Sequence, residues 1–183
     1  TRAAGRLNRI EGIEPAKIRK VAMLGGGVMG SGIVNLLLQG GFDAILWDIH
    51  DQAIQKGLSA IRKTFDYSIK TKKMSEKDRE DLMSQRLTTT TVLQDSLYAD
   101  LVIEAVLEDI KIKQGIWKSI EKICPSQTVF ATNTSALPIT EMAEVLKNPG
   151  RMIGLHFFNP ADRMQLLEVI CAKKTSDQTL ATS

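Results

Sequence analysis

Three glycines near the start of the chain stand at a spacing that suits phosphate binding. Gly25, Gly27 and Gly30 match the pattern G-x-G-x-x-G. Gly25 and Gly27 follow the apolar run Val21–Leu24, and Gly30 lies in the first turn of the amphipathic stretch Val28–Gln39, an order that predicts a strand, a tight turn and a helix. In such a unit the glycines permit the turn, let a pyrophosphate approach the backbone and let the helix pack closely on the strand. The free N–H groups at the start of the helix would then bind the phosphates.

A second feature, independent of the glycines, selects among dinucleotides. Asp48 ends the next apolar run, Ala44–Trp47, and lies 18 residues after Gly30. A carboxylate at this position accepts hydrogen bonds from the ribose hydroxyls and repels a 2′-phosphate, and no arginine occurs among residues 49–51. The pattern therefore predicts NAD rather than NADP, with FAD as the alternative because it shares the glycine fingerprint.

Three further residues could act on a bound substrate. His156 follows the apolar run Met152–Leu155, so it is either an acid/base group at the ligand-facing end of a strand or a satisfied core histidine. Glu168 lies in another apolar run, where an unpaired carboxylate is costly to bury; we predict pairing with His156, with a solvated strand-end glutamate as the alternative. Ser135 follows the run Val129–Thr132 and is either at the same edge of the sheet or part of a simple turn.

The elements that must position these residues alternate along the chain. Strands are predicted at 21–24, 44–47, 87–92, 101–103, 129–132, 152–155 and 166–172. Helices are predicted at 28–39, from the N-cap Asp51 to Ile69, after a capping box of Ser75 and Asp78, at 109–123, and at 139–146 with Thr140 as N-cap. This order predicts an α/β fold: a Rossmann-like, doubly wound, mostly parallel sheet with helices on both faces.

The composition of the chain excludes several classes of protein. The chain has 183 residues, 43% hydrophobic and 25% charged, which suits one globular domain and excludes intrinsic disorder. A net charge of +3 gives no reason to expect a nucleic-acid partner, and no apolar stretch reaches the ~20 residues that span a bilayer. Cys124 and Cys171 are too few for a disulfide scaffold or a zinc site, so no metal is expected and a reducing compartment is favoured.

Five spaced segments together resemble one family. They are Gly25–Gly32, Val102–Glu108, Ala131–Ser135, His156–Pro160 and Leu167–Ile170. The chain resembles the NAD-binding domain of the L-3-hydroxyacyl-CoA dehydrogenases of fatty-acid β-oxidation. The resemblance implies an NAD-binding Rossmann domain at 17–175. It also implies a linker or the tail of a preceding domain at 1–16, as in multifunctional enzymes that fuse enoyl-CoA hydratase to the dehydrogenase, and the start of a C-terminal helical domain at 176–183.

The resemblance also implies a reaction and roles for single residues. The family oxidises (S)-3-hydroxyacyl-CoA to 3-oxoacyl-CoA with NAD. His156 would be the catalytic acid/base, Glu168 its partner, and Ser135 would bind the substrate oxygen near the nicotinamide. The remaining cofactor contacts would be Met29, Glu108, Lys113 and Asn159.

Several alternatives stay open. The chain could be an NAD(H)-binding module without turnover, or a dehydrogenase of free 3-hydroxy acids. Lys70, Lys72 and Lys73 are interpreted as a solvated helix end, with binding of CoA phosphates as the alternative. Arg2, Arg6 and Arg9 suit the tail of a preceding domain or an organellar transit peptide.

The family's second domain bears on activity and partners. That helical domain completes the acyl-CoA cleft, so this chain alone is expected to bind NAD and to turn over weakly or not at all. Apart from the 3-hydroxyacyl-CoA or 3-oxoacyl-CoA substrate, the expected partners are a thiolase subunit or a second copy bound through the C-terminal domain. The expected compartment is the cytoplasm in a bacterium, and otherwise the peroxisome or mitochondrial matrix.

Overall fold

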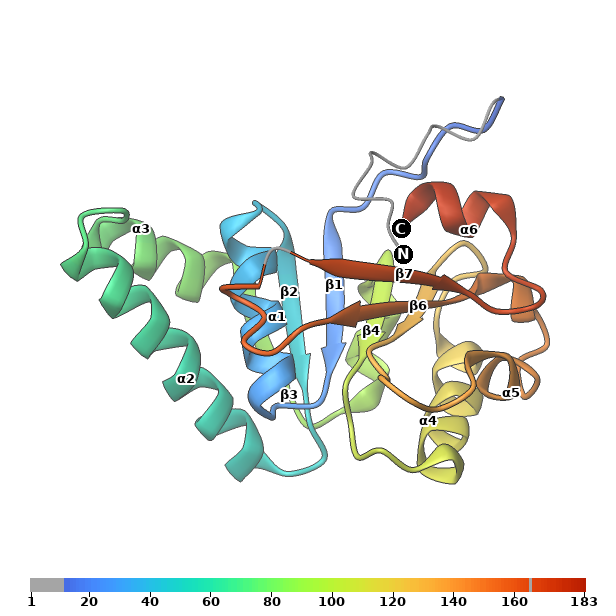
Figure 1. Ribbon diagram of the computed structural model, residues 1–183. Coiled ribbons are helices and arrows are strands. Elements are labelled where there is room, and N and C mark those ends of the chain that lie inside the picture. The colour runs from blue at the N-terminus through green and yellow to red at the C-terminus, as the bar shows by residue number, and fades with distance from the viewer. Residues whose placement is uncertain (1–11, 165) are drawn as a thin grey trace.

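Seven strands form one sheet in the computed structural model, which describes residues 12–164 and 166–183 (Figure 1). Their order is β3-β2-β1-β4-β5-β6-β7, with every neighbouring pair parallel except β6 and β7. The strands are β1 Lys20–Leu24, β2 Asp43–Trp47, β3 Leu87–Thr90, β4 Leu101–Glu104, β5 Val129–Thr132, β6 Met152–Phe157 and β7 Leu167–Cys171. The predicted Rossmann-like, mostly parallel sheet is confirmed.

Helices cover both faces of the sheet (Figure 1). They are α1 Val28–Gln39, α2 Asp51–Lys70, α3 Glu76–Asp81, α4 Ile110–Ile123, α5 Ile139–Ala143 and α6 Asp177–Thr182. A π-helical turn at Leu82–Arg86 and 3₁₀ turns at Leu93–Tyr98 and Pro149–Arg151 complete the elements. Among the described residues, no helix is long and apolar enough to cross a membrane.

The central strand β1 shows why the sheet is buried on both sides. Val21 and Met23 pack in the cluster that includes Phe65 of α2, whereas Ala22 and Leu24 pack in the cluster that includes Trp117 of α4. A strand covered on both faces needs apolar side chains at consecutive positions rather than in alternation. This explains the continuous apolar run before the glycine turn.

Two predicted helix N-caps are wrong. Asp51 is the first residue of α2, and the N-cap is His50, whose side chain makes no capping hydrogen bond. A carboxylate in the first turn still interacts favourably with the helix dipole. Helix α5 has Pro138 rather than Thr140 as N-cap, and the Thr140 hydroxyl instead accepts a hydrogen bond from the Lys173 N–H at 3.1 Å. The helix ends at Ala143 rather than at the predicted Leu146.

The capping box at the start of α3 is confirmed. The Ser75 hydroxyl accepts a bond from the Asp78 N–H at 3.0 Å, and the Asp78 carboxylate accepts one from the Ser75 N–H at 2.9 Å. Helix α3 is short, with no buried residue, so local capping rather than packing determines its first residue.

The strands near the carboxyl end also differ from prediction. Strand β6 continues through His156 to Phe157, because β7 pairs with it over this length. Strand β7 is an edge strand with mostly exposed side chains, so its apolar run does not mark a buried position. Strand β3 stops at Thr90, whose hydroxyl accepts a bond from the Val92 N–H at 2.9 Å. Most of the predicted lead-in, residues 1–11, lies outside the described residues.

Candidate functional site

The glycine turn between β1 and α1 is shaped for a close ligand. Gly25 has φ +110, a backbone conformation that favours glycine. A Cβ atom on Gly30 would lie 1.8 Å from the Gly25 carbonyl oxygen, so any larger residue would force the turn apart. At Gly27, by contrast, a Cβ atom would meet nothing within 4 Å, and this N-cap has no side chain to satisfy the first N–H groups of α1. The turn therefore fits the pyrophosphate of a dinucleotide.

Asp48 lies beside the same turn. Strand β1 pairs with β2 in register Leu24↔Trp47, and this pairing brings the residue after β2 next to the glycines. One carboxylate oxygen of Asp48 accepts the Gly26 N–H at 2.8 Å and the other accepts the His50 N–H at 3.0 Å. Each oxygen keeps a second lone pair, so the half-buried carboxylate can still accept ribose hydroxyls while the backbone holds it in place.

His156 and Glu168 face one another across the β6–β7 pair, in register with each other. The His156 Nδ1 atom lies 2.8 Å from a carboxylate oxygen of Glu168, and the Phe158 ring lies against the imidazole at 4.6 Å between centroids. The Glu168 side chain is 50% exposed, so the premise that it is buried is wrong, although the two residues are in contact. A carboxylate can only accept, so Nδ1 carries the proton of a neutral imidazole and Nε2 remains the basic nitrogen.

Six of the predicted site residues line one hollow of about 370 Å³ at the carboxyl edge of the sheet: Met29, Glu108, Lys113, Ser135, His156 and Asn159. They come from α1, the β4–α4 loop, α4, the β5–α5 loop, β6 and the loop after β6. The remaining predicted residues do not line it. Gly25, Gly27, Gly30 and Asp48 lie around the turn at the start of α1, and Glu168 lies against His156 on β7.

Asn133 is a site residue that sequence reasoning missed. It lines the hollow, and its side-chain oxygen accepts the Phe157 N–H at 2.8 Å. This bond ties the loop that carries Ser135 to the strand that carries His156. The sequence evidence for a role of Asn133 is weak, because an Asn in an Asn-Thr-Ser loop is typical of an ordinary turn.

Glu104 is a second missed residue, although it lies within the segment Val102–Glu108 that carries the family resemblance. Glu104 is the last residue of the apolar strand β4, a position similar to that of Asp48 just after β2. Unlike Asp48, Glu104 is fully buried. One of its carboxylate oxygens accepts bonds from the Lys113 ammonium at 2.5 Å and from the Val106 N–H at 2.8 Å. The other accepts the Thr132 hydroxyl at 2.8 Å.

Glu108 completes this polar cluster at the wall of the hollow. Its carboxylate lies 3.1 Å from the Lys113 ammonium and also accepts the Thr134 hydroxyl. Burial acts to raise the pKa of Glu108, but hydrogen bonds from Thr134 and Lys113, with the charge of Lys113, hold the pKa below its ordinary value. Glu108 is therefore an anion at neutral pH.

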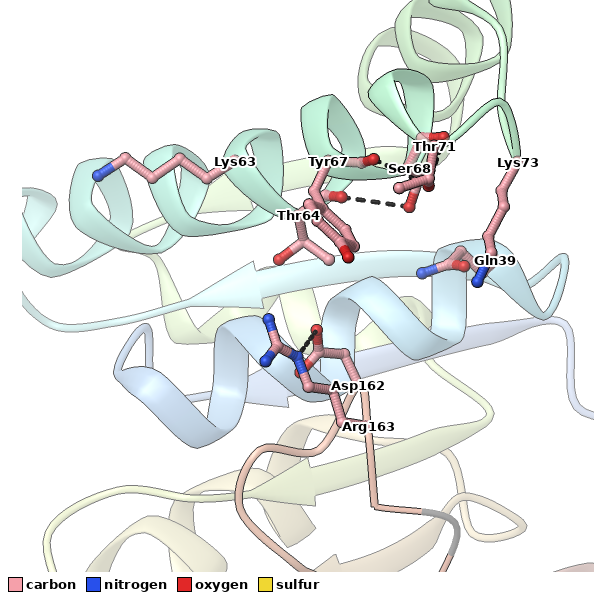
Figure 2. Close-up of a pocket in the computed structure, with 9 residues that line it drawn as sticks. All are labelled: Gln39, Lys63, Thr64, Tyr67, Ser68, Thr71, Lys73, Asp162 and Arg163. Carbon is pink, nitrogen blue, oxygen red and sulfur yellow. Dashed lines mark hydrogen bonds and ion pairs between the residues drawn. The ribbon is translucent and has the colours of Figure 1, made fainter.

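A second hollow, of about 410 Å³, lies beside α2 (Figure 2). Hydroxyl groups on α2 line this hollow. Its charged lining residues are the cations Lys63, Lys73 and Arg163 and the acidic residue Asp162. Figure 2 shows Lys73 reaching toward Gln39, whereas Lys63 points away from the other labelled side chains. Of the three lysines at the end of α2 that could bind phosphate, only Lys73 lines this hollow.

No metal centre is present among the described residues, where no group of three or more His, Cys, Asp or Glu side chains could hold an ion.

Comparison with known proteins places these features in a family. Residues 20–183 match the family described as 3-hydroxyacyl-CoA dehydrogenase, NAD binding domain. The alpha subunit of the fatty acid oxidation complex of Shewanella oneidensis is 40% identical over 174 residues, which are 94% of this chain and 24% of that protein. The chain thus spans about a quarter of the length of the curated relatives it matches.

Solved structures agree with the family match. An (S)-3-hydroxybutyryl-CoA dehydrogenase from Ralstonia eutropha superimposes with a TM-score of 0.86 at 37% identity, covering 89% of this chain and 57% of that one. The dehydrogenase part of multifunctional enzyme 1 from C. elegans superimposes with a TM-score of 0.84 at 30% identity, covering 98% of this chain and 41% of that one.

Proposed function

The chain belongs to the family of 3-hydroxyacyl-CoA dehydrogenase NAD-binding domains, and from this premise we propose that it carries the cofactor site and the acid/base pair for oxidation of (S)-3-hydroxyacyl-CoA to 3-oxoacyl-CoA. The observation that carries the proposal is the His156–Glu168 pair at the wall of the hollow that Glu108, Lys113 and Ser135 also line. Binding of a dinucleotide alone would not require a paired imidazole there.

His156 is the base in the proposed reaction. Its Nδ1–H donates to Glu168, so Nε2 accepts the proton of the substrate hydroxyl. The Glu168 carboxylate stabilises the imidazolium that forms and fixes the orientation of the ring. In the reverse direction the imidazolium returns this proton to the ketone oxygen.

Ser135 and the glycine turn position the reactants. The Ser135 hydroxyl, at the wall of the same hollow, donates a hydrogen bond to the substrate oxygen. NAD, when bound, supplies the acceptor for the carbon-bound hydrogen and its electron pair. The N–H groups at the start of α1 would hold the pyrophosphate, and Asp48 would hold the adenosine ribose and exclude a 2′-phosphate.

The arrangement of hollows supports a CoA thioester over a free hydroxy acid. A third hollow shares Asn159 with the His156 hollow and shares Thr64 and Asp162 with the basic hollow beside α2. The three are neighbours along one side of the chain, and we propose that an extended substrate crosses them with its reacting carbon at His156 and an anionic end near Lys73 and Arg163. A short free acid would leave the basic hollow without a ligand.

The test compares the thioester with its free acid. Turnover with NAD⁺ is measured on the full-length gene product, because the curated relatives extend well beyond this chain. We expect NADH formation with (S)-3-hydroxybutyryl-CoA and none with (S)-3-hydroxybutyrate. Turnover of the free acid alone would contradict the substrate proposal, and NADH binding without turnover of either compound would favour a binding module.

Partners follow from the same comparisons. The name of the curated relatives describes one subunit of a complex, which supports a thiolase subunit or a second copy of the chain as the partner. Size-exclusion chromatography of the full-length gene product with and without a thiolase separates these two possibilities. The bacterial relatives support a cytoplasmic site of action, which cell fractionation tests.

A further inference from the structure

A buried ion cluster backs the hollow that is proposed to take the nicotinamide. The side chains of Glu104 and Lys113 are 0% and 1% exposed, and their charged atoms lie 2.5 Å apart. The Lys113 ammonium also contacts Glu108, 3.1 Å away, at the wall of the hollow. One lysine therefore serves two carboxylates, of which one is fully buried and does not itself reach the hollow.

The hydrogen bonds of Glu104 identify it as a carboxylate. Its two oxygens accept three bonds, from the Lys113 ammonium, the Val106 N–H and the Thr132 hydroxyl. The ammonium and the N–H can only donate, so the Glu104 oxygen that they share acts as an acceptor. Together with Glu108, whose pKa is lowered by the hydrogen bonds described above, the cluster carries two negative charges and one positive charge.

The charged residues that follow Glu108 in the chain do not cancel the net negative charge of the cluster. Asp109 and Lys111 follow Glu108 in the chain and carry opposite charges, and the Asp109 carboxylate accepts the Lys111 and Ile112 N–H groups at the start of α4. The cluster therefore presents one net negative charge at the hollow, and burial weakens solvent screening for its Glu104–Lys113 part.

We propose that Glu104 is a positioning residue that biases the cofactor site toward the oxidised nicotinamide. The proposal rests on the proposed function, because it needs the nicotinamide to occupy the hollow that Glu108 and Lys113 line. The oxidised ring carries a positive charge that the reduced ring lacks. A net negative cluster therefore strengthens binding of NAD⁺ relative to NADH, while the pairing with Glu104 holds Lys113 in place.

The test is the ratio of the Kd values for NAD⁺ and NADH, measured by calorimetry on this chain. The variant Glu104→Gln removes one negative charge and keeps the shape of the side chain. Coulomb's law at an effective dielectric constant of about 20 and a separation of about 10 Å predicts that NAD⁺ weakens relative to NADH roughly tenfold. The matched control Thr132→Val removes a hydrogen bond to Glu104 without changing charge, so it should leave the ratio unchanged.

A second variant covers the case in which Glu104→Gln does not fold, as circular dichroism would show. Glu108→Gln also removes one negative charge, from a half-exposed position, and should shift the ratio of the NAD⁺ and NADH Kd values in the same direction. Any weakening that is common to both cofactors leaves this ratio unchanged. A wild-type ratio in either folded charge variant, or an equal shift in Thr132→Val, would overturn the proposal. Failure of the wild-type chain to bind either cofactor would overturn the placement of the nicotinamide as well. If the charge variants shift the ratio as expected but the full-length gene product does not turn over acyl-CoA, only the proposed function is contradicted.

Discussion

The imidazole of His156 and the carboxylate of Glu168 are cross-strand partners, with Nδ1 and the carboxylate oxygen 2.8 Å apart on the antiparallel strands β6 and β7. The direction of β7 makes this contact possible, because residues twelve positions apart in sequence become direct neighbours with side chains on one face. The pair therefore depends on strand register and not on any local sequence pattern.

The first prediction separates catalysis from cofactor binding. Replacing His156 with Gln removes the proposed base, and turnover of the full-length gene product should fall about 10²- to 10⁴-fold. The Kd for NADH should stay within about twofold, because the proposed pyrophosphate contacts lie at the glycine turn. Glu168→Gln should reduce turnover less, since Nε2 remains available. Turnover at the wild-type rate in His156→Gln would contradict the proposed role.

The second prediction concerns the choice of dinucleotide. Asp48→Ser removes the carboxylate that would repel a 2′-phosphate, so binding of NADPH relative to NADH should improve about tenfold or more. Calorimetric titration with both reduced cofactors measures the change, and Asp51→Asn, at an exposed position in the first turn of α2, is the control. Equal shifts in both variants would mean that Asp48 does not select the cofactor.

The third prediction compares two glycines in helices. Gly30→Ala would place a methyl group against the Gly25 carbonyl oxygen, so it should destabilise the chain by about 2 kcal/mol or more and weaken NADH binding. At Gly115, in α4, a Cβ atom meets nothing within 4 Å. Gly115→Ala should therefore stabilise the chain by about 0.5–1 kcal/mol through helix propensity. Denaturant unfolding of both variants checks this, and equal effects would show that the turn is not tightly packed.

The fourth prediction tests the basic hollow. The double variant Lys73→Ala/Arg163→Ala should raise KM for the acyl-CoA about three- to tenfold and leave kcat nearly unchanged, because only binding of the anionic end is weakened. A pantetheine thioester without the nucleotide should show no such change. Lys70→Ala, at a neighbouring lysine that does not line the hollow, serves as the control. An unchanged KM in the double variant would leave the lysines of α2 as a solvated helix end.

The fifth prediction concerns the two thiols. Burial raises the pKa of Cys124 to about 11, with a smaller opposing effect from the charge of Arg151, whereas Cys171 is exposed on the edge strand β7. Because the thiolate is the reactive form, a thiol reagent at neutral pH should modify Cys171 in the native chain and Cys124 only after unfolding. Mass spectrometry of labelled peptides identifies each site. Rapid native labelling of Cys124 would contradict its burial.

The sequence by itself determined the elements whose signals are local. The bounds of α1 are predicted without error, and the Ser75–Asp78 capping box is present, because helical periodicity and capping act over a few neighbouring residues. The glycine turn and the acid after β2 were also readable, since each depends on residue type at a fixed position beside a strand. The five spaced segments were specific enough to indicate the family that the comparison confirms.

Features that depend on residues far apart in the sequence became visible only in the folded chain. The burial of Glu104 and its contact with Lys113 require β4 and α4 to meet, and no local pattern distinguishes this acid from an exposed one at a strand end. The hydrogen bond from the Phe157 N–H to Asn133 likewise joins segments 24 positions apart. Strand β7 has an apolar composition yet is exposed, because burial depends on what covers a strand and not on its own side chains. Long-range packing therefore determines the charge and the orientation of the groups that line the site.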